Sequence, residues 1–194
     1  PDILLIVVDT LRSDSIGDLS VKNGSTENMN GLAADGTIFT RAFAQSSWTL
    51  PSFISLWTGQ YAFEHRVGRS PTDEDLFGRL PEEATTLAER MKSQGYQTAA
   101  IINNTFLAPS FGADQGFDTY LYEGADNSNL RTAEKTTSEA LRWLEGSEGS
   151  SRLLVVHYME PHMHLQPPSH VRGTILSEEN TKVPVPYMSI HADK

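Results

Sequence analysis

An aspartate that directly follows an apolar run is the first residue of this chain whose position suits chemistry. The run Ile3–Val8 has the length of a buried strand, and Asp9 comes immediately after it. In open α/β sheets, ligands bind beyond the carboxyl ends of the strands, and a carboxylate there is a good ligand for a hard metal ion. An Asp in this place also suits the cap of a following turn or helix, so position alone leaves both interpretations open.

A threonine at the start of an expected helix is the second such residue. Within the segment 46–59, Pro51 suits the first turn of a helix and Gly59 suits the position just past its end. Thr49 is therefore expected at or before the helix cap, where a helix start would hold an anion such as a phosphate group against its hydroxyl. Because Ser, Thr and Pro cap helices routinely, this motif becomes informative only together with others.

The elements that must position these residues follow from the apolar pattern. Unalternating apolar runs, typical of strands buried on both faces of a parallel sheet, cover Ile3–Val8, Thr98–Ile102 and Leu153–Val156. Helical patterns, each followed by a glycine, cover residues 26–35, 81–94 and 132–145. Pro81 and the two acidic residues after it are expected to begin the second helix. Strands that alternate with helices predict an α/β fold with a mostly parallel sheet sandwiched by helices.

The sheet predicted in this way is incomplete. After about residue 163 the pattern dissolves, because Pro167, Pro168, Pro184 and Pro186 interrupt it, which predicts a long loop or excursion over 163–194. Ending an α/β sheet there would leave edges uncovered. Residues 1–194 are therefore expected to form the N-terminal portion of a single α/β catalytic domain whose remainder lies elsewhere.

Composition excludes several classes of function. A net charge of −10 argues against a nucleic-acid-binding surface, and it means that an anionic substrate needs a strong local positive source. The absence of cysteine excludes disulfides, thiolate metal sites and thiol nucleophiles. No apolar run approaches the roughly 18–20 residues of a membrane-spanning helix. The protein is expected to be soluble; because the chain opens on Pro1, export stays open, as does the oligomeric state.

Six motifs in a fixed order give the chain a family resemblance. They are Asp9–Asp14, Thr49–Gln60, Tyr61–Val67, Leu80–Ala99, Gly116–Asp118 and Val156–His162 with Pro167-Pro168. In this order, from residue 2 to about 168, they resemble sulfatase-like members of the alkaline phosphatase superfamily. The resemblance implies an alkaline-phosphatase-like fold and a metal-dependent ester hydrolase acting on a small anionic substrate.

The resemblance also implies roles for individual residues. Asp9 would bind a divalent metal ion, and Thr49 would be both a metal ligand and the nucleophile, giving a covalent Thr ester that water or an acceptor resolves. His162 and His65 would be catalytic, stabilising transferred oxygens or protonating the leaving group. His157 lies inside an apolar run and is interpreted as structural.

Two further residues are candidates for substrate binding. Arg12 would contact substrate or pair with Asp14, and the residues leave that choice open. Asn103 occupies a place where family sulfatases hold a lysine, and Thr105 stands where they hold a histidine.

Departures from the sulfatase pattern bear on the reaction. Sulfatases convert a Cys or Ser to formylglycine within a segment that carries an Arg four residues later, whereas this chain has Thr49 and Phe53 in those places. Thr10 also stands where the family has a second acidic residue. No formylglycine is therefore expected, and the sequence favours a hydrolase or transferase of phosphate esters, with a sulfuric ester hydrolase as the alternative.

Part of the expected metal site is missing. The family's later Asp-His pair does not occur in these residues, so the fragment alone is expected to be inactive. The hard oxygen ligands fit Ca, Mg or Mn, and an added His would admit Zn. A non-catalytic member that binds an anion or a partner protein is a further alternative. A haloacid-dehalogenase-type domain is disfavoured by Leu11, where that fold needs a second Asp, and a receiver-like domain by the lack of a Lys after a late strand.

Overall fold

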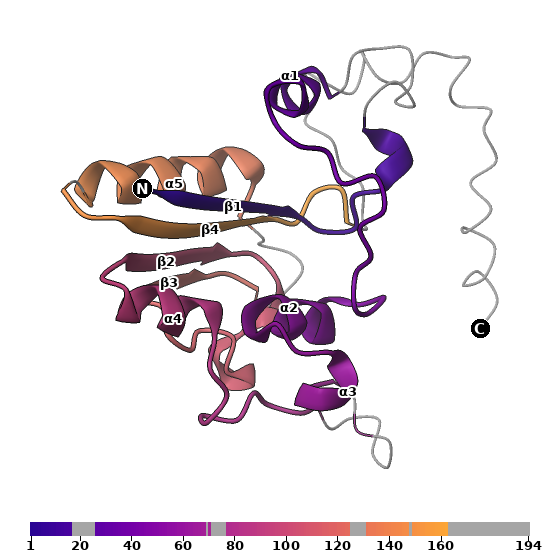
Figure 1. The fold of residues 1–194 in the computed structure, drawn as a ribbon, viewed down its shortest axis with the longest axis vertical. Helices are drawn as coiled ribbons and strands as arrows, with labels where there is room; N and C mark the ends of the chain where they lie inside the picture. Colours follow the sequence, from indigo (N-terminus) through magenta and orange to yellow (C-terminus); the bar gives the residue numbers. More distant parts are fainter. Residues whose placement is uncertain (17–25, 69, 71–76, 125–130, 148, 163–194) are drawn as a thin grey trace. The chain divides into compact units, whose positions relative to one another are not determined.

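The computed structural model describes residues 1–16, 26–68, 70, 77–124, 131–147 and 149–162 (Figure 1). The loop predicted over 163–194 lies outside the described residues. The chain divides into two compact units, one formed by Pro1–Thr10 with Thr40–Met163 and the other by Leu11–Phe39 with His164–Lys194. The described elements of the second unit are η1 (Ser13–Ser15) and α1 (Glu27–Asp35), and α1 confirms the first predicted helix.

A parallel four-stranded sheet organises the first unit. The strands β1 (Ile3–Val8), β2 (Gln97–Ile102), β3 (Thr119–Tyr122) and β4 (Arg152–Tyr158) lie in the order β1-β4-β2-β3. Every neighbouring pair is parallel, with Val7 opposite His157 and Ile101 opposite Val156. The predicted α/β fold with a parallel sheet and helices is confirmed, and β3 is a strand that the apolar pattern did not predict.

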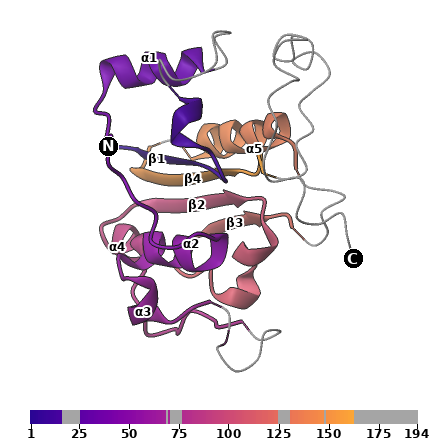
Figure 2. The same cartoon turned by 90° about the vertical axis from the view of Figure 1, so that its right-hand side faces the viewer.

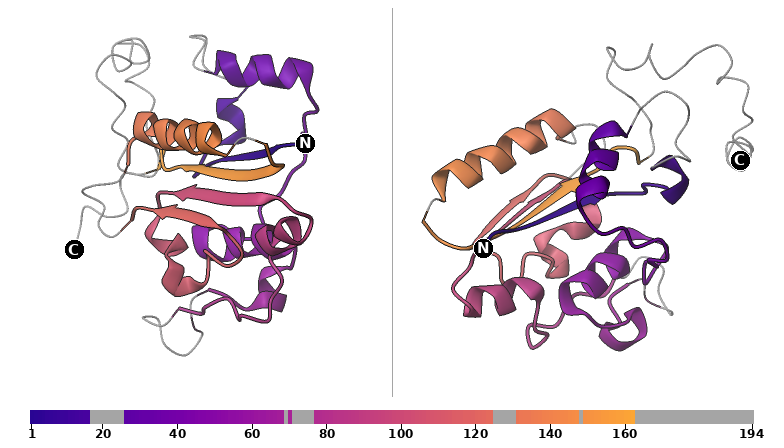
Figure 3. Two further views of the ribbon diagram at one scale, coloured as in Figure 1. Left: turned by 90° about the vertical axis from the view of Figure 1, so that its left-hand side faces the viewer. Right: turned by 45° about the horizontal axis from the view of Figure 1, so that its top comes forward.

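Helices pack on both faces of this sheet, as Figures 2 and 3 show. One face packs against α5 (Ala133–Gly146) through a cluster that includes Ala99, Ile101, Leu154 and Val156. The other face packs against α2 (Thr49–Thr58) through Phe53 and Trp57, which meet Ala100, Ile102 and Val155. The short helices α3 (Ala62–His65), α4 (Leu87–Ser93), η3 (Thr105–Leu107) and η4 (Pro109–Phe111) complete the described part of this unit.

Two predictions about these elements were wrong in detail. Ile3–Val8 was expected to be buried on both faces, but β1 is the edge strand of the described sheet, and Ile3, Leu4 and Ile6 are exposed. The second predicted helix begins at Leu87 rather than Pro81. Thr86 is its N-cap: the Thr86 hydroxyl accepts from the Glu89 N–H, and the Glu89 carboxylate accepts from the Thr86 N–H. This reciprocal capping box fixes where the helix starts.

None of the helices within the described ranges is long and apolar enough to cross a membrane.

Candidate functional site

Three polar side chains, those of Asp9, Asn104 and His157, lie on the face of the sheet that packs against α2, because side chains alternate along each strand. Leu5 and Val7 of β1 contact the cluster that contains Phe53 and Trp57, and side chains two residues apart share a face. Asp9 continues that series beyond β1, and its N–H donates to the Tyr158 carbonyl at 2.9 Å, so the β1–β4 pairing extends to it. By the same alternation Asn104 continues the Ala100–Ile102 series of β2. In β4, His157 follows Val155 and meets the Phe53 ring edge-on at 5.3 Å.

The three residues meet Thr49 around one oxygen. Asp9 Oδ2 accepts hydrogen bonds from Thr49 Oγ1 at 3.2 Å and from Asn104 Nδ2 at 2.9 Å, and it lies 3.3 Å from His157 Nε2. Asn104 Nδ2 also lies 3.4 Å from Thr49 Oγ1. The Asp9 and Asn104 side chains are nearly buried and His157 is fully buried. The structure thus brings the predicted metal ligand and the predicted nucleophile into direct contact.

The partners of His157 define which nitrogen carries its proton. The backbone N–H of Asn103 donates to His157 Nδ1 at 3.3 Å, so Nδ1 is an acceptor. In the neutral ring the proton then sits on Nε2, and Nε2–H donates to the Asp9 carboxylate.

The charge of Asp9 follows from this environment. Burial alone raises the pKa of Asp9, but the hydrogen bond from His157, the electrostatic effect of the nearby His157 and His162 rings, and the hydrogen bond from Asn104 outweigh it. The pKa of Asp9 is therefore lowered from its ordinary value, and the carboxylate is ionised at neutral pH. An ionised carboxylate is the form that binds a cation.

Thr49 owes its place to the start of α2. It is the first residue of that helix, after Trp48 in extended conformation, and Gly59 ends the helix in the left-handed region at φ 72° as predicted. Trp48 meets Phe106 edge-on at 5.3 Å and Phe77 at 5.9 Å, which anchors the chain just before Thr49. The Thr49 hydroxyl therefore stands at the positive end of a packed helix, where a developing anion is stabilised.

Asn103, the amide predicted to bind substrate, faces the opposite side of the sheet from Asn104. Its side chain is fully buried, its Nδ2 donates to Thr136 Oγ1 at 2.8 Å and to the His157 carbonyl at 2.6 Å, and its Oδ1 accepts from Arg131 at 3.1 Å. Asn104, which sequence reasoning did not single out, is the amide that contacts Asp9 and Thr49. Two asparagines directly after an apolar strand indicate polar side chains at the end of that strand, but the sequence does not indicate which of the two faces α2.

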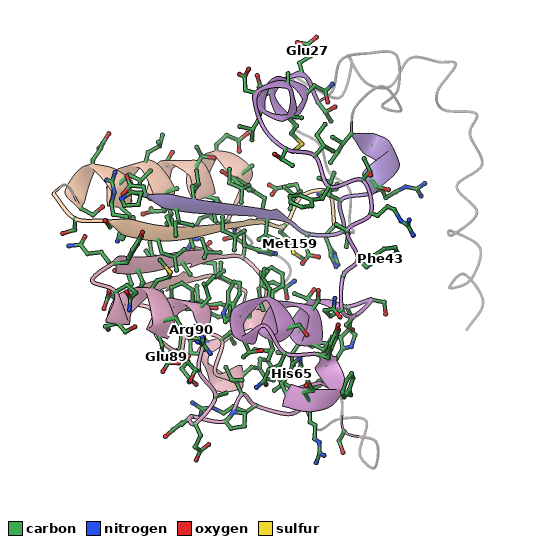
Figure 4. The ribbon with its side chains drawn as sticks, in the orientation of Figure 1. Glu27, Phe43, His65, Glu89, Arg90 and Met159 are labelled. Atoms are coloured by element: carbon green, nitrogen blue, oxygen red, sulfur yellow. The ribbon has the colours of Figure 1, made fainter. Side chains whose placement is uncertain are left out.

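The remaining predicted residues lie in different surroundings. His162 is half-buried in the turn after β4, where its N–H donates to the Met159 carbonyl at 2.8 Å, and it is one of the groups that lower the pKa of Asp9. Arg12 precedes η1 in the second unit and is exposed. Figure 4 shows Met159 just beyond the end of β4.

His65 joins α3 to α2 rather than to Asp9. Its Nδ1 accepts from the Val67 N–H at 3.0 Å, its Nε2 lies 3.0 Å from Ser55 Oγ, and its label in Figure 4 stands beside α2 and α3. Burial lowers the pKa of His65. Among the described residues, no hydrogen bond joins His65 to Asp9 or Thr49.

Thr10 adds strained backbone beside the site. It follows Asp9 with φ 55°, in the left-handed region that β-branched residues rarely adopt. Such conformations persist only where the surrounding structure holds them, and they cluster at functional sites.

The arrangement offers an ionised carboxylate, a hydroxyl at a helix start and an amide donor around one point. Asp9 and Thr49 contribute two hard oxygens of the kind that a divalent cation prefers. In the part of the chain that the structure describes, no group of three or more His, Asp or Glu side chains is placed to hold a metal ion. Asp9 and Thr49 alone therefore supply only two of the ligands that a divalent cation needs.

The Sulfatase family model matches residues 1–182 of the chain. An N-acetylgalactosamine-6-O-sulfatase of Bacteroides thetaiotaomicron is 33% identical over 119 residues, which are 59% of this chain and 22% of that protein. Arylsulfatase A of Bos taurus is 34% identical over 98 residues, 50% of this chain and 19% of that protein. The chain thus spans about a fifth of the length of these curated relatives.

Solved structures share the fold. A protein solved in complex with its substrate D-glucosamine-2-N,6-O-disulfate superposes with a TM-score of 0.75 and 18% identity, covering 91% of this chain and 38% of that one. The phosphonate monoester hydrolase of Agrobacterium radiobacter superposes with a TM-score of 0.64 and 22% identity, covering 84% of this chain and 41% of that one. At these identities the likeness concerns the fold.

Proposed function

Because the chain belongs to the sulfatase family, we propose that it forms part of a sulfuric ester hydrolase and supplies its nucleophile, Thr49. The observation that carries this proposal is the 3.2 Å contact between Thr49 Oγ1 and Asp9 Oδ2 at the start of α2. The two curated relatives named above are sulfatases, which supports sulfate as the group transferred. The substrate is a small anionic ester.

The chain's own residues support a two-step transfer. Thr49 Oγ1 attacks the sulfur, Asp9 accepts the hydroxyl proton, and the bond between sulfur and the substrate's alcohol oxygen breaks. His162 gives that oxygen a proton, so the alcohol leaves neutral and Thr49 holds a sulfate ester. Water then attacks the same sulfur and gives a proton to His162, the bond between sulfur and Thr49 Oγ1 breaks to release hydrogen sulfate, and Asp9 returns the hydroxyl proton to Thr49. Asn104 Nδ2 stands 3.4 Å from Thr49 Oγ1, where it can donate to an oxygen of the transferred group.

A divalent cation fits the proposed chemistry. Asp9 and Thr49 would hold it through hard oxygens, with the remaining ligands supplied by other parts of the protein, and Ca, Mg, Mn or Zn are the candidates. Such an ion, when bound, lowers the proton affinity of a coordinated hydroxyl and polarises the ester. Asn104 is a poor candidate ligand, because its Oδ1 accepts from the Phe106 N–H at 2.9 Å.

A second candidate is a hydrolase or transferase of phosphate esters. It is favoured by Thr49 itself, because threonine cannot form the formylglycine aldehyde that the family's sulfatases use, and an unmodified hydroxyl is the nucleophile that phosphoryl transfer needs. The site geometry serves both reactions, since sulfate and phosphate esters present similar tetrahedral oxyanions.

Turnover by the full-length protein tests both candidates. We expect p-nitrophenyl sulfate to be hydrolysed faster than p-nitrophenyl phosphate or bis-p-nitrophenyl phosphate; the reverse preference would establish the phosphate-ester hydrolase instead. Thr49→Ala should lower turnover of the preferred ester by on the order of 10³-fold or more. Thr58→Ala is the matched control, because Thr58 lies in the same helix and its hydroxyl donates to the Ile54 carbonyl.

Two results would contradict the proposal. Activity of Thr49→Ala within a few-fold of wild type would exclude Thr49 as the nucleophile. No turnover of any of these esters, with inorganic sulfate or phosphate still bound, would favour a non-catalytic member that binds anions. Intact-protein mass spectrometry of the quenched reaction should also show a sulfate or phosphate adduct that Thr49→Ala lacks.

A further inference from the structure

We propose that His157 is a positioning residue, which holds the Asp9 carboxylate in place through a single ring tautomer fixed by the backbone N–H of Asn103, the residue that follows β2. The inference rests on the proposed function only in so far as Asp9 serves there as a cation ligand. The sequence suggested a structural histidine, but one of the two polar partners of this buried ring is Asp9 itself.

The polar contacts of His157 run in one direction. Asn103 N–H donates to Nδ1 at 3.3 Å, and Nε2 lies 3.3 Å from Asp9 Oδ2. Because the backbone N–H of Asn103 can only donate, Nδ1 must accept, and the neutral ring presents its one N–H to Asp9. The orientation of the carboxylate is therefore coupled to the position of the backbone directly after β2.

The backbone donor is itself held from several sides. The Asn103 side chain donates to the His157 carbonyl at 2.6 Å and to Thr136 of α5 at 2.8 Å. Its oxygen accepts from Arg131 Nη1 at 3.1 Å, and Arg131 Nε lies 3.6 Å from a Glu123 carboxylate oxygen. Asn103 thus ties β2, β4 and α5 together at the residue whose N–H sets the tautomer.

Packing fixes the plane of the ring. His157 is 0% exposed, and the Phe53 ring of α2 meets it edge-on at 5.3 Å and 76°. Phe53 and Thr49 lie in one helix, so α2 presents the nucleophile and also packs the ring that orients Asp9. A residue that hydrogen-bonds a ligand carboxylate in this way tunes the site without touching substrate, and losing it typically costs 10–100-fold in metal affinity or activity.

The tautomer can be measured without any assay of function. In the full-length protein labelled with ¹⁵N-histidine, long-range ¹H–¹⁵N correlation spectra at pH 7 distinguish a protonated from an unprotonated ring nitrogen. His157→Gln assigns the His157 signals by their loss. We expect the neutral ring to carry its proton on Nε2 and not on Nδ1; a neutral ring protonated on Nδ1 would overturn the inference.

Three substitutions separate positioning from packing. In His157→Gln the amide nitrogen takes the place of Nε2 and can still donate to Asp9, whereas in His157→Asn the shorter amide reaches only the Asn103 side. His157→Phe keeps the ring but loses both polar contacts. We expect Phe and Asn to weaken Mn²⁺ binding by about 10–100-fold, measured by isothermal titration, while Gln stays within about five-fold of wild type.

The control must lower stability without touching Asp9. Trp57→Phe serves, because Trp57 belongs to the same buried cluster and its Nε1 donates to the Ala113 carbonyl at 2.8 Å. We expect this variant to melt earlier and to bind Mn²⁺ as wild type does. If the Gln variant loses as much Mn²⁺ affinity as the Phe variant, or if affinity simply follows melting temperature across all four variants, His157 only fills space.

Failure of the proposed function would look different. A wild-type protein that hydrolyses none of the esters refutes the hydrolase, yet the ring tautomer and the order of Mn²⁺ affinities still decide the role of His157. Where wild type is active, kcat should fall in the same order as Mn²⁺ affinity at saturating substrate; equal kcat in the Phe variant and wild type would overturn the inference.

Discussion

Adding one methyl group at Gly116 should destabilise the fold far more than the same change at another glycine. Gly116 has φ 88°, and a Cβ built on it would lie 2.5 Å from Glu89 Cγ, 2.6 Å from Glu89 N and 2.9 Å from Thr86 Oγ1. Two of these atoms belong to the hydrogen bond that caps α4, in which Thr86 Oγ1 accepts from Glu89 N at 3.1 Å. The methyl group cannot enter without moving backbone.

The expected loss has two parts. A residue with a Cβ costs about 1–2 kcal/mol in the left-handed region, and forcing an extra methyl into a packed site costs about 1–3 kcal/mol. Gly116→Ala should therefore lower the free energy of unfolding by about 2–5 kcal/mol. Gly95 is the matched control: its φ is 83° and no atom lies within 4 Å of its Cβ position, so Gly95→Ala should cost only the first part, about 1–2 kcal/mol.

Urea denaturation of the two variants beside wild type, followed by circular dichroism, measures this difference. The comparison is meaningful where the slope of the unfolding transition is unchanged, because both variants then report on the same native and unfolded states. A Gly116→Ala loss no larger than that of Gly95→Ala would refute the reasoning, since it would mean that the neighbours of Gly116 relax freely. It would also mean that steric crowding at the α4 cap is not why a glycine stands at the start of the Gly116–Asp118 motif.

Three other changes test separate features of the structure by the same measurement. Thr10→Asn should raise the free energy of unfolding by about 1 kcal/mol, because Asn tolerates the left-handed region better than a β-branched residue. Trp57→Ala should lower it by about 3–5 kcal/mol, because Trp57 is 2% exposed. The hydrogen bond from Lys92 lowers the pKa of the Asp118 carboxyl below its ordinary value of 3.8. The stability that ionised Asp118 contributes is therefore fully present above pH 3.8 and is lost as pH falls through the lower pKa of the folded state. Asp118→Asn should therefore flatten the acid limb of the stability curve.

The apolar pattern predicted the parts of the fold that are buried on both sides. The runs in β2 and β4 are continuous because helices cover both faces of those strands. β3 escaped prediction because its four residues, Thr119–Tyr122, are only half-buried and three of them carry hydroxyls. The edge position of β1 depends on the order of strands in space, which a local pattern does not contain.

Local chemistry also misled in one place. Pro81 and the two acidic residues after it have the composition of a first helical turn, yet α4 begins at Leu87. The reciprocal hydrogen bonds of Thr86 and Glu89 determine where α4 starts. The three-residue spacing of Thr86 and Glu89 is typical of a capping box, but the prediction followed the composition around Pro81 instead.

The contact between Asp9 and Thr49 was predictable because both residues sit at ends of elements, where the fold class alone brings them near each other. The contributions of Asn104 and His157 were not, because they depend on which face of its strand each side chain takes. A shift of one residue in β2 would turn Asn103 toward α2 and Asn104 toward α5.

The same alternation explains why neighbouring asparagines have such different roles. Asn104 continues the face that α2 covers, so its amide reaches Asp9 and Thr49. Asn103 continues the face that α5 covers, so its side chain bonds within the interior while its backbone N–H reaches across to His157. One residue therefore acts on Asp9 through its side chain and the next through its backbone, and the parallel register of β2 with β4 makes both contacts converge on one carboxylate oxygen.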